Sequence, residues 1–220
     1  SQSLSFNSYI EKNIWSKLDM ALQEFLMKTS VPDKFSPELC ECLTESRGCK
    51  ETLDTLMKGN INISLMGTEY CYHNLFLEFL REKLNQSDID KQSLNKRTAD
   101  YYLQKGDFLT AKNYAMKSRD IGTIAQVVRS FFSLKIFSID EYMEFHKLYG
   151  LHAIPDAICD KMPLLYIPRI FFCYASGDIN GANCLLDKLY PLMPQTAAAH
   201  PEVTEHVNSM IMLDCRVKIS

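Results

Sequence analysis

The chain has 220 residues, a net charge of −3 and 46% hydrophobic residues, an ordinary globular composition with room for one large domain or two small ones. Its most apolar stretch, residues 162–176, is interrupted by Pro163, Pro168 and Arg169, so it falls short of the about 18 apolar residues that a membrane span needs. No basic cluster followed by an apolar segment opens the chain. We therefore expect no signal peptide, a cytoplasmic location and no membrane partner.

Helix signals dominate the start of the chain. Ser36, Pro37 and Glu38 are typical of a helix opening, with a serine cap, a proline at the first helical position and an acidic first turn. Gly59–Asn60 is typical of a helix end. The helices expected before this point cover residues 5–18, 19–29, 36–44 and 49–58.

A β-hairpin, a histidine and an amphipathic helix follow in that order. Residues 61–72 alternate apolar and polar side chains around a turn at Gly67, which predicts a hairpin. His73 follows the hairpin and directly precedes a helix, so its imidazole can point outward from the start of that helix. Spacings of three and four predict the apolar stripe of that helix, formed by Leu75, Phe76, Phe79, Leu80 and Leu84. Three helices and a two-stranded wing give a winged-helix pattern, here with an extra helix at each end.

The charge of this region argues against duplex DNA as a partner. Residues 1–86 contain nine Lys and Arg against twelve Asp and Glu. The helix that would enter a DNA groove, residues 49–58, has two basic and two acidic side chains. Because duplex binding depends on Lys and Arg that neutralise phosphates, we expect no direct DNA binding by this chain.

Beyond residue 86 the pattern is purely helical and partly repetitive. A helix over residues 88–105 ends at Gly106–Asp107, and a second helix follows over residues 108–118. The same pattern of a helix, a Gly-Asp turn and a second helix recurs at Gly177–Asp178, 71 residues further on. This distance is close to twice the period of tetratricopeptide-like repeats, which is about 34 residues. The middle unit, residues 121–162, is degenerate. Residues 197–218 predict one more helix. The expected fold class is mainly α: a winged-helix domain with a small β-hairpin, then TPR-like α-helical repeats in an α-solenoid.

The repeats predict a binding surface rather than an active site. Most of their apolar side chains build a core, while stacked helix pairs leave a concave face for a ligand or partner. Tyr101, Tyr142 and Tyr149 are aromatic candidates for that face, but sequence alone does not separate them from core residues. Residues 87–220 carry fifteen basic and fifteen acidic side chains, so charge does not identify a partner.

No catalytic or metal-binding pattern is present in the sequence. There is no phosphate-cradling Gly-rich loop ending in Lys-Ser or Lys-Thr, no Gly-x-Ser-x-Gly and no His-Glu-x-x-His. Cys40, Cys42 and Cys49 form the one cysteine cluster, without the paired spacing of zinc sites. The five histidines do not pair at metal-ligand spacings: His73, His146, His152, His200 and His206. We expect reduced thiols, no metal, no catalytic residues and no enzymatic activity in this chain.

Nearly the whole chain resembles a region of bacterial signal-transduction ATPases of the STAND class. These are large ATP-dependent, LuxR-type transcription regulators related to the maltose-regulon activator. The segments that carry the resemblance are residues 9–14, 25–30, 38–40, 73–81 and 99–107. One departure is Cys71, where the family usually has a basic residue. The resemblance implies a winged-helix regulatory domain over residues 1–86 and a TPR-like helical repeat (sensor) region over residues 87–220.

In such regulators an ATPase domain precedes the winged helix and a LuxR-type DNA-binding domain follows the repeats. The resemblance therefore implies an internal fragment that relays nucleotide and inducer state between these two domains. It further implies that His73 contacts the phosphate of bound ADP in the full-length protein. Neither ATP nor ADP would bind this fragment alone. Its implied partners are its own ATPase domain, an inducer or regulatory protein at the repeats, and other copies of the full-length protein.

Two other classes of function remain open from the sequence. A free-standing helical-repeat adaptor for protein–protein interaction would lack an ATPase upstream. A small hydrolase with an unrecognised site would show turnover on a broad substrate panel. We expect the regulatory fragment.

Overall fold

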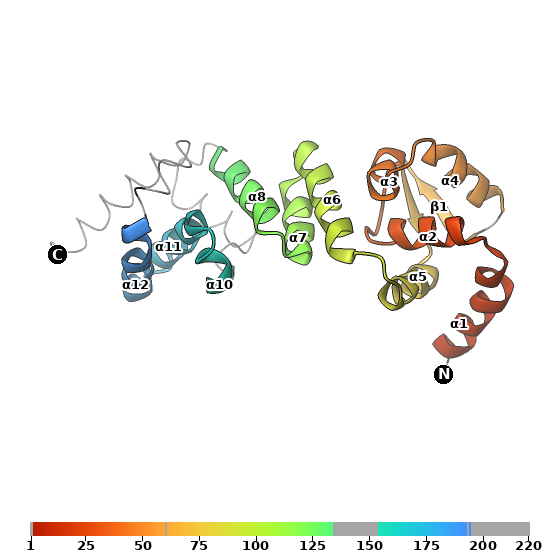
Figure 1. Ribbon diagram of the computed structural model, residues 1–220, viewed down its shortest axis with the longest axis horizontal. Helices are drawn as coiled ribbons and strands as arrows, with labels where there is room; N and C mark the ends of the chain where they lie inside the picture. Colours follow the sequence, from red (N-terminus) through yellow and green to blue (C-terminus); the bar gives the residue numbers. More distant parts are fainter. Residues whose placement is uncertain (1, 60, 134–153, 193, 195–220) are drawn as a thin grey trace. The chain divides into compact units, whose positions relative to one another are not determined.

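A computed structural model describes residues 2–59, 61–133, 154–192 and 194 of the chain (Figure 1). These residues are mainly helical, with a two-stranded antiparallel hairpin, which confirms the expected fold class. The chain divides into two compact units, Ser1–Lys105 and Gly106–Ser220. The domain boundary expected after residue 86 stays a prediction, since a compact unit is not the same as a domain that folds alone.

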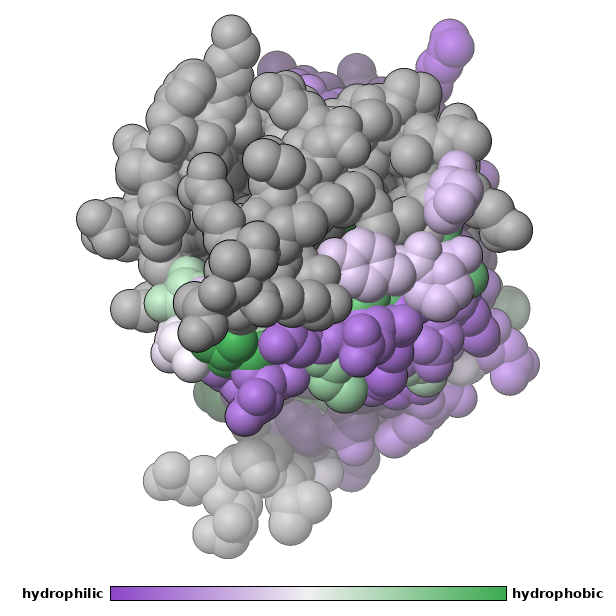
Figure 2. All heavy atoms as spheres, turned by 90° about the vertical axis from the view of Figure 1, so that its left-hand side faces the viewer, coloured by the Kyte–Doolittle hydropathy of each residue, from purple (hydrophilic) through white to green (hydrophobic). Residues whose placement is uncertain are grey.

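The length and apolar character of the described helices can be compared with those of a membrane span. None of them is both long enough and apolar enough to cross a bilayer. Figure 2 shows one face of the molecule, where hydrophilic side chains predominate among the coloured residues and hydrophobic side chains form only small patches.

The first unit contains the winged helix. Its elements are α1 (Gln2–Asn13), η1 (Trp15–Lys17), α2 (Met20–Thr29), α3 (Pro37–Thr44), α4 (Cys49–Lys58), β1 (Ile63–Met66), β2 (Glu69–Tyr72), α5 (Asn74–Gln86) and α6 (Lys91–Gln104). Ser36 accepts a hydrogen bond from the Leu39 amide and caps α3, as predicted. α6 begins later than residue 88 because Asp90 is its cap and accepts hydrogen bonds from the amides of Gln92 and Ser93.

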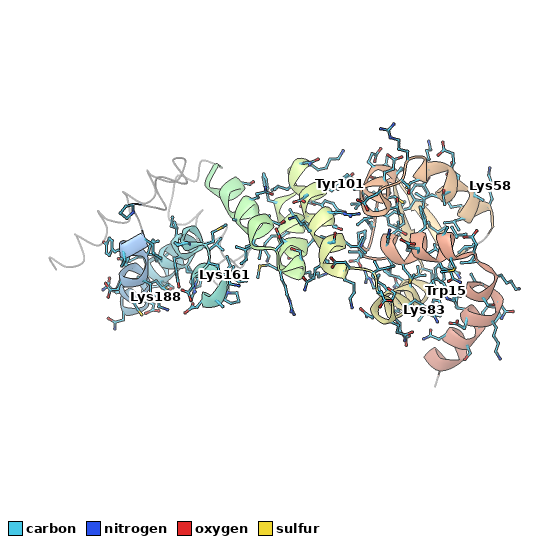
Figure 3. The ribbon with its side chains drawn as sticks, in the orientation of Figure 1. Trp15, Lys58, Lys83, Tyr101, Lys161 and Lys188 are labelled. Carbon is cyan, nitrogen blue, oxygen red and sulfur yellow. The ribbon has the colours of Figure 1, made fainter. Side chains whose placement is uncertain are left out.

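The helix expected over residues 5–18 is wrong in its second half. α1 ends at Asn13 and a single 3₁₀ turn follows. That turn points Trp15 into the core, where its ring meets Phe79 edge-on at a centroid distance of 5.6 Å. Lys83 of α5 lies over the Trp15 ring at 5.8 Å and pairs with Glu11 at 2.6 Å (Figure 3). The packing of the Trp15 ring thus determines where α1 ends and how α1 is attached to α5.

An isolated β-bridge extends the two-stranded sheet at Phe35. Phe35 and Tyr70 exchange both backbone hydrogen bonds, at 3.0 and 2.8 Å, so the segment before α3 pairs with β2. Phe35 is fully buried and lies beside the rings of Tyr70 and Tyr72. The sequence analysis missed this pairing, because a single bridged residue has no alternating pattern of its own.

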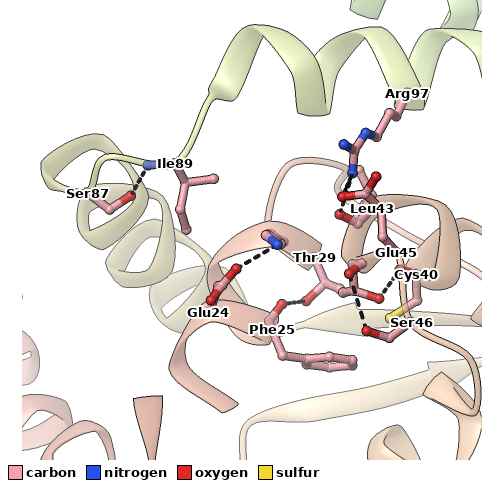
Figure 4. Close-up of polar contacts among 12 residues, drawn as sticks. Glu24, Phe25, Thr29, Cys40, Leu43, Glu45, Ser46, Ser87, Ile89 and Arg97 are labelled. Atoms are coloured by element: carbon pink, nitrogen blue, oxygen red, sulfur yellow. Dashed lines mark hydrogen bonds and ion pairs between the residues drawn. The ribbon is translucent and has the colours of Figure 1, made fainter. Parts of the chain in front are cut away.

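Two arginines from later helices bind the ends of earlier ones. Arg81 of α5 donates to the carbonyls of Ser30 and Val31, at 2.9 and 3.1 Å, beyond the end of α2, and also pairs with Asp33 at 2.7 Å. Arg97 of α6 contacts the end of α3 in the same way (Figure 4). A helix end has carbonyls without helical partners, so a positively charged donor there stabilises it.

Replacing Arg81 with methionine is expected to lower the free energy of unfolding of the first unit by about 1–2 kcal/mol. The change keeps the aliphatic stem but leaves the carbonyl of fully buried Ser30 without its charged donor. Urea denaturation followed by fluorescence of Trp15, the one tryptophan of the chain, measures the effect. Arg47→Met in an exposed loop is the matched control. Equal stabilities of the two variants would contradict the prediction.

In the described part of the second unit, helices lie in neighbouring pairs. Its described elements are α7 (Phe108–Ser118), α8 (Ile121–Ser133), α10 (Asp156–Cys159), η3 (Pro163–Leu165), α11 (Tyr166–Ala175), α12 (Ile179–Leu189) and η4 (Tyr190–Leu192). α7 packs on α8, and α11 packs on α12. Small residues lie on the inner sides of these helices, since Ala111, Ala115 and Ala182 are buried. The TPR-like repeat remains a prediction.

The two Gly-Asp turns have the same local geometry. Gly106 and Gly177 adopt φ values of +77° and +80°, a left-handed conformation that favours glycine. In each case the following aspartate caps the next helix through its side chain, Asp107 at the Thr110 amide and Asp178 at the Gly181 amide. Arg119 repeats the conformation before α8, with a φ of +57°. The sequence analysis missed this third turn because an arginine occupies the glycine position.

Polar contacts join three helices of the second unit. Asp156 of α10 accepts hydrogen bonds from Arg169 of α11 and, at 3.0 Å, from Lys188 of α12. The hydrogen bond from Arg169, followed by that from Lys188, holds the pKa of Asp156 below its ordinary value. The helix expected over residues 197–218 and the candidates Tyr142 and Tyr149 lie outside the described residues.

Candidate functional site

His73 lies at the junction of β2 and α5, as the sequence predicts. Its amide donates to the Asn62 carbonyl at 2.8 Å, and its carbonyl accepts from the Leu77 amide at 2.9 Å. Its neighbour Tyr72 is buried, whereas the His73 side chain is exposed. The backbone is thus held at both ends while the imidazole faces away from the core. Asn62, which adopts an unusual φ of +30°, was missed by the sequence analysis.

The start of α5 differs electrostatically from most other helix starts of the unit. Asp19, Ser36 and Asp90 cap α2, α3 and α6 with side-chain oxygens. His73 occupies the cap position of α5 without a capping side-chain hydrogen bond, and the first turn of α5 contains no acidic residue. The first amides of a helix and its dipole favour an anion, and an imidazole N–H adds a further donor. The arrangement is therefore chemically suited to a phosphate or carboxylate.

A buried hydrogen bond fixes the backbone that presents His73. The Tyr72 phenol lies 2.6 Å from the Thr29 hydroxyl. That hydroxyl also donates to the Phe25 carbonyl of α2 (Figure 4). Burial raises the pKa of the Tyr72 phenol, so it stays protonated and neutral. Phe76 packs edge-on against Tyr72 one turn into α5. The position of His73 is therefore set by the core beside Tyr72 together with the backbone hydrogen bonds of His73.

The apolar stripe predicted for α5 needs one correction. Phe76, Phe79, Leu80 and Leu84 are buried as expected, but Leu75 is 39% exposed and Leu77 is buried in its place. Leu75 lies in the first turn, beside the exposed histidine, where the core does not reach. Hairpin residues near the turn are exposed for the same reason, with Leu65 at 49% and Met66 at 56%.

A groove of about 460 Å³ lies elsewhere in the first unit, between α2 and the start of α4. It is lined by Asp19, Ala21, Leu22, Glu24, Phe25, Lys28, Thr44, Ser46, Arg47, Cys49 and Thr52, a set that does not include His73. Acidic and basic side chains both border it, and Lys28 already pairs with Glu24 at 2.6 Å. Since these charges largely cancel, the groove does not select an anion or a cation.

Among the described residues, the thiols give no second site. The cysteines in the described ranges are free. Cys40 is fully buried, and burial raises its pKa, which keeps the thiol protonated and unreactive. Within residues 2–59, 61–133, 154–192 and 194, no group of three His, Cys, Asp or Glu side chains is placed to hold a metal ion. His146, His152, His200 and His206 lie outside those ranges.

α4 corresponds to the DNA-reading helix of a winged helix. Its exposed charged side chains are Lys50, Glu51 and Lys58. Asp54 is half-buried and accepts a hydrogen bond from the Tyr70 phenol at 3.0 Å, which fastens α4 to the hairpin. The outward side of α4 is therefore almost neutral, unlike the basic surface that phosphate contacts require.

We expect the chain to show no saturable, sequence-specific binding to duplex DNA in a mobility-shift titration at low salt. Too few unpaired cations lie on α4 to neutralise several phosphates. A Glu51→Lys variant adds charge to the same helix and is expected to increase salt-sensitive, nonspecific binding, which shows that the assay responds. Nanomolar binding of the unchanged chain to one sequence would refute the prediction.

Comparison with known proteins agrees with this architecture. Residues 11–92 match the MalT winged helix domain family. The chain is 29% identical to the HTH-type transcriptional regulator MalT of Vibrio parahaemolyticus over 185 residues, which are 82% of this chain and 20% of the relative. It is 28% identical to the MalT of Vibrio campbellii over 127 residues, 56% of this chain and 14% of the relative. The chain thus spans a fifth or less of the relatives it matches. Residues 11–92 are therefore similar to the MalT winged helix domain, within a chain that resembles part of MalT-like transcriptional regulators.

Proposed function

We propose that this chain is the regulatory and sensor part of an ATP-dependent, LuxR-family transcription regulator. It relays nucleotide and inducer state between an ATPase domain and a DNA-binding domain that lie outside the chain. The observation that carries the proposal is the match of residues 11–92 to the MalT winged-helix domain, with His73 exposed at the start of α5. Both relatives are HTH-type transcriptional regulators, which supports the same proposal.

In this proposal His73 acts as a nucleotide sensor. Its imidazole and the first amides of α5 donate to a phosphate of ADP that is bound by the ATPase domain. ADP then holds the winged helix against the ATPase domain in the resting state. The chain contributes binding and not catalysis, so any ATP hydrolysis belongs to the ATPase domain. A His73→Ala change in the full-length protein tests the proposal through the retention of ADP.

The second unit supplies the sensor in the same proposal. Its neighbouring helix pairs, α7 with α8 and α11 with α12, support a surface built from stacked helices. An inducer or a regulatory protein would bind there, and self-association of the full-length protein would follow activation. These partners are soluble, which agrees with a cytoplasmic regulator.

A further inference from the structure

Helix α6 lies mostly beyond the family domain and yet belongs to the first unit. The match to the winged-helix family ends at residue 92, whereas the compact unit extends to Lys105. α6 packs on α3, and its Leu94 is buried in the same core cluster as α3 and α5. The helix that leads out of the winged helix is therefore fastened to it.

The contacts that hold α6 in the first unit change along the helix, from buried side chains to polar contacts. Its buried residues are Leu94, Thr98 and Ala99, and none of the five residues that follow is buried. Those last residues are attached by polar contacts to the segment just before α3, and the rings of Tyr101 and Tyr102 also pack, half-buried, against the core cluster. The Tyr101 phenol lies 2.9 Å from the Ser36 hydroxyl, and the Tyr102 phenol donates to the Lys34 carbonyl at 3.4 Å.

A third polar contact reaches the opposite end of α3. Arg97 donates to the Leu43 carbonyl at 3.4 Å and pairs with Glu45 at 3.0 Å, where the Glu45 side chain is 68% exposed (Figure 4). Glu45 ends α3 in a left-handed conformation, and Ser36 caps its start. α6 is therefore attached near both ends of α3 through side chains that are partly exposed to solvent.

We propose that the polar contacts of Arg97, Tyr101 and Tyr102 form a reversible clamp, which holds the last residues of α6, 100–104, to α3 and the segment before it. Polar contacts that are only partly buried exchange against water at little net cost, so they can open while Leu94, Thr98 and Ala99 stay in the core. Residues 105–107 are all that separates α6 from α7, so opening would loosen the direct connection to the second unit. The regulatory role of the clamp rests on the proposed function. In that role, the clamp regulates how binding of an inducer to the sensor region is transmitted to the winged helix.

Hydrogen exchange of the full 220-residue chain tests the clamp itself. The double variant Arg97→Gln, Tyr101→Phe removes two of its contacts without adding bulk. Amide exchange in residues 100–105 is expected to accelerate about tenfold, as the loss of one to two hydrogen bonds implies. Protection of α4 and α5 should not change. The matched control, Lys50→Gln with Tyr9→Phe, alters exposed residues outside the clamp and should leave α6 protected.

Two results of this experiment would overturn the clamp. Unchanged exchange in residues 100–105 would show that these contacts do not hold α6, and an equal acceleration throughout the first unit would make α6 an ordinary part of the core. For regulation, the same double variant in the full-length regulator should shift the inducer concentration for half activation. An unshifted response despite faster exchange would remove the regulatory role. Failure of the His73 test, in contrast, would defeat the proposed nucleotide sensing and leave the exchange result standing.

Discussion

Replacing His73 with alanine in the full-length regulator is expected to weaken the retention of ADP by roughly ten- to a hundred-fold. The physical reason is the loss of one hydrogen bond to a charged phosphate, worth about 1.5–3 kcal/mol. The change should spare the fold, because the imidazole is exposed and makes no capping hydrogen bond, while the backbone of His73 carries the contacts to Asn62 and Leu77. Equilibrium dialysis with labelled ADP measures the effect.

Two controls make the His73 experiment specific. Asn74→Ala removes an exposed polar side chain from the same helix start and should retain ADP as wild type does. The 220-residue chain alone should show no measurable affinity for ADP, because the proposal places the nucleotide in a domain outside the chain. If the His73→Ala protein holds ADP as tightly as wild type and still depends on inducer, the histidine is only structural.

Deleting residues 163–220 is expected to cause aggregation or the loss of cooperative melting in the part of the second unit that remains. The deletion removes η3, which contacts α8 and contains fully buried Leu165. It thereby uncovers part of the apolar side of α8, where Ile124 and Val127 are buried. Exposing one such side chain costs about 1.5–3 kcal/mol, and several are affected together.

Two probes separate the units in this truncation. Fluorescence of Trp15 reports on the first unit and should keep its transition, since η1 packs on α5 within that unit. Far-UV circular dichroism reports on all helices and should lose its cooperative transition, with an increase in light scattering. A soluble truncation with an unchanged melting curve would show that residues 87–162 close on themselves, and the repeat prediction would fail.

The sequence by itself determined the elements whose signals lie within a few residues. The cap at Ser36 with Pro37 starts α3, and Gly106 and Gly177 each adopt the left-handed turn before a capping aspartate. Gly67, with a φ of +67°, places the hairpin turn where the alternation predicts it. The exposed position of His73 follows from the same local reasoning, because a residue between a buried strand end and a helix start has little core beside it.

Only the tertiary structure decided the contacts between distant segments. Phe35 pairs with Tyr70, Arg81 binds the carbonyls beyond α2, and Arg97 binds the end of α3. Each partner lies some 35 to 55 residues away, and nothing in the local pattern of a phenylalanine or an arginine says which surface it will meet. The same holds for the exchange of Leu75 for Leu77 in the core. Periodicity gives the apolar side of a helix, but the extent of the neighbouring elements decides how much of that side is covered.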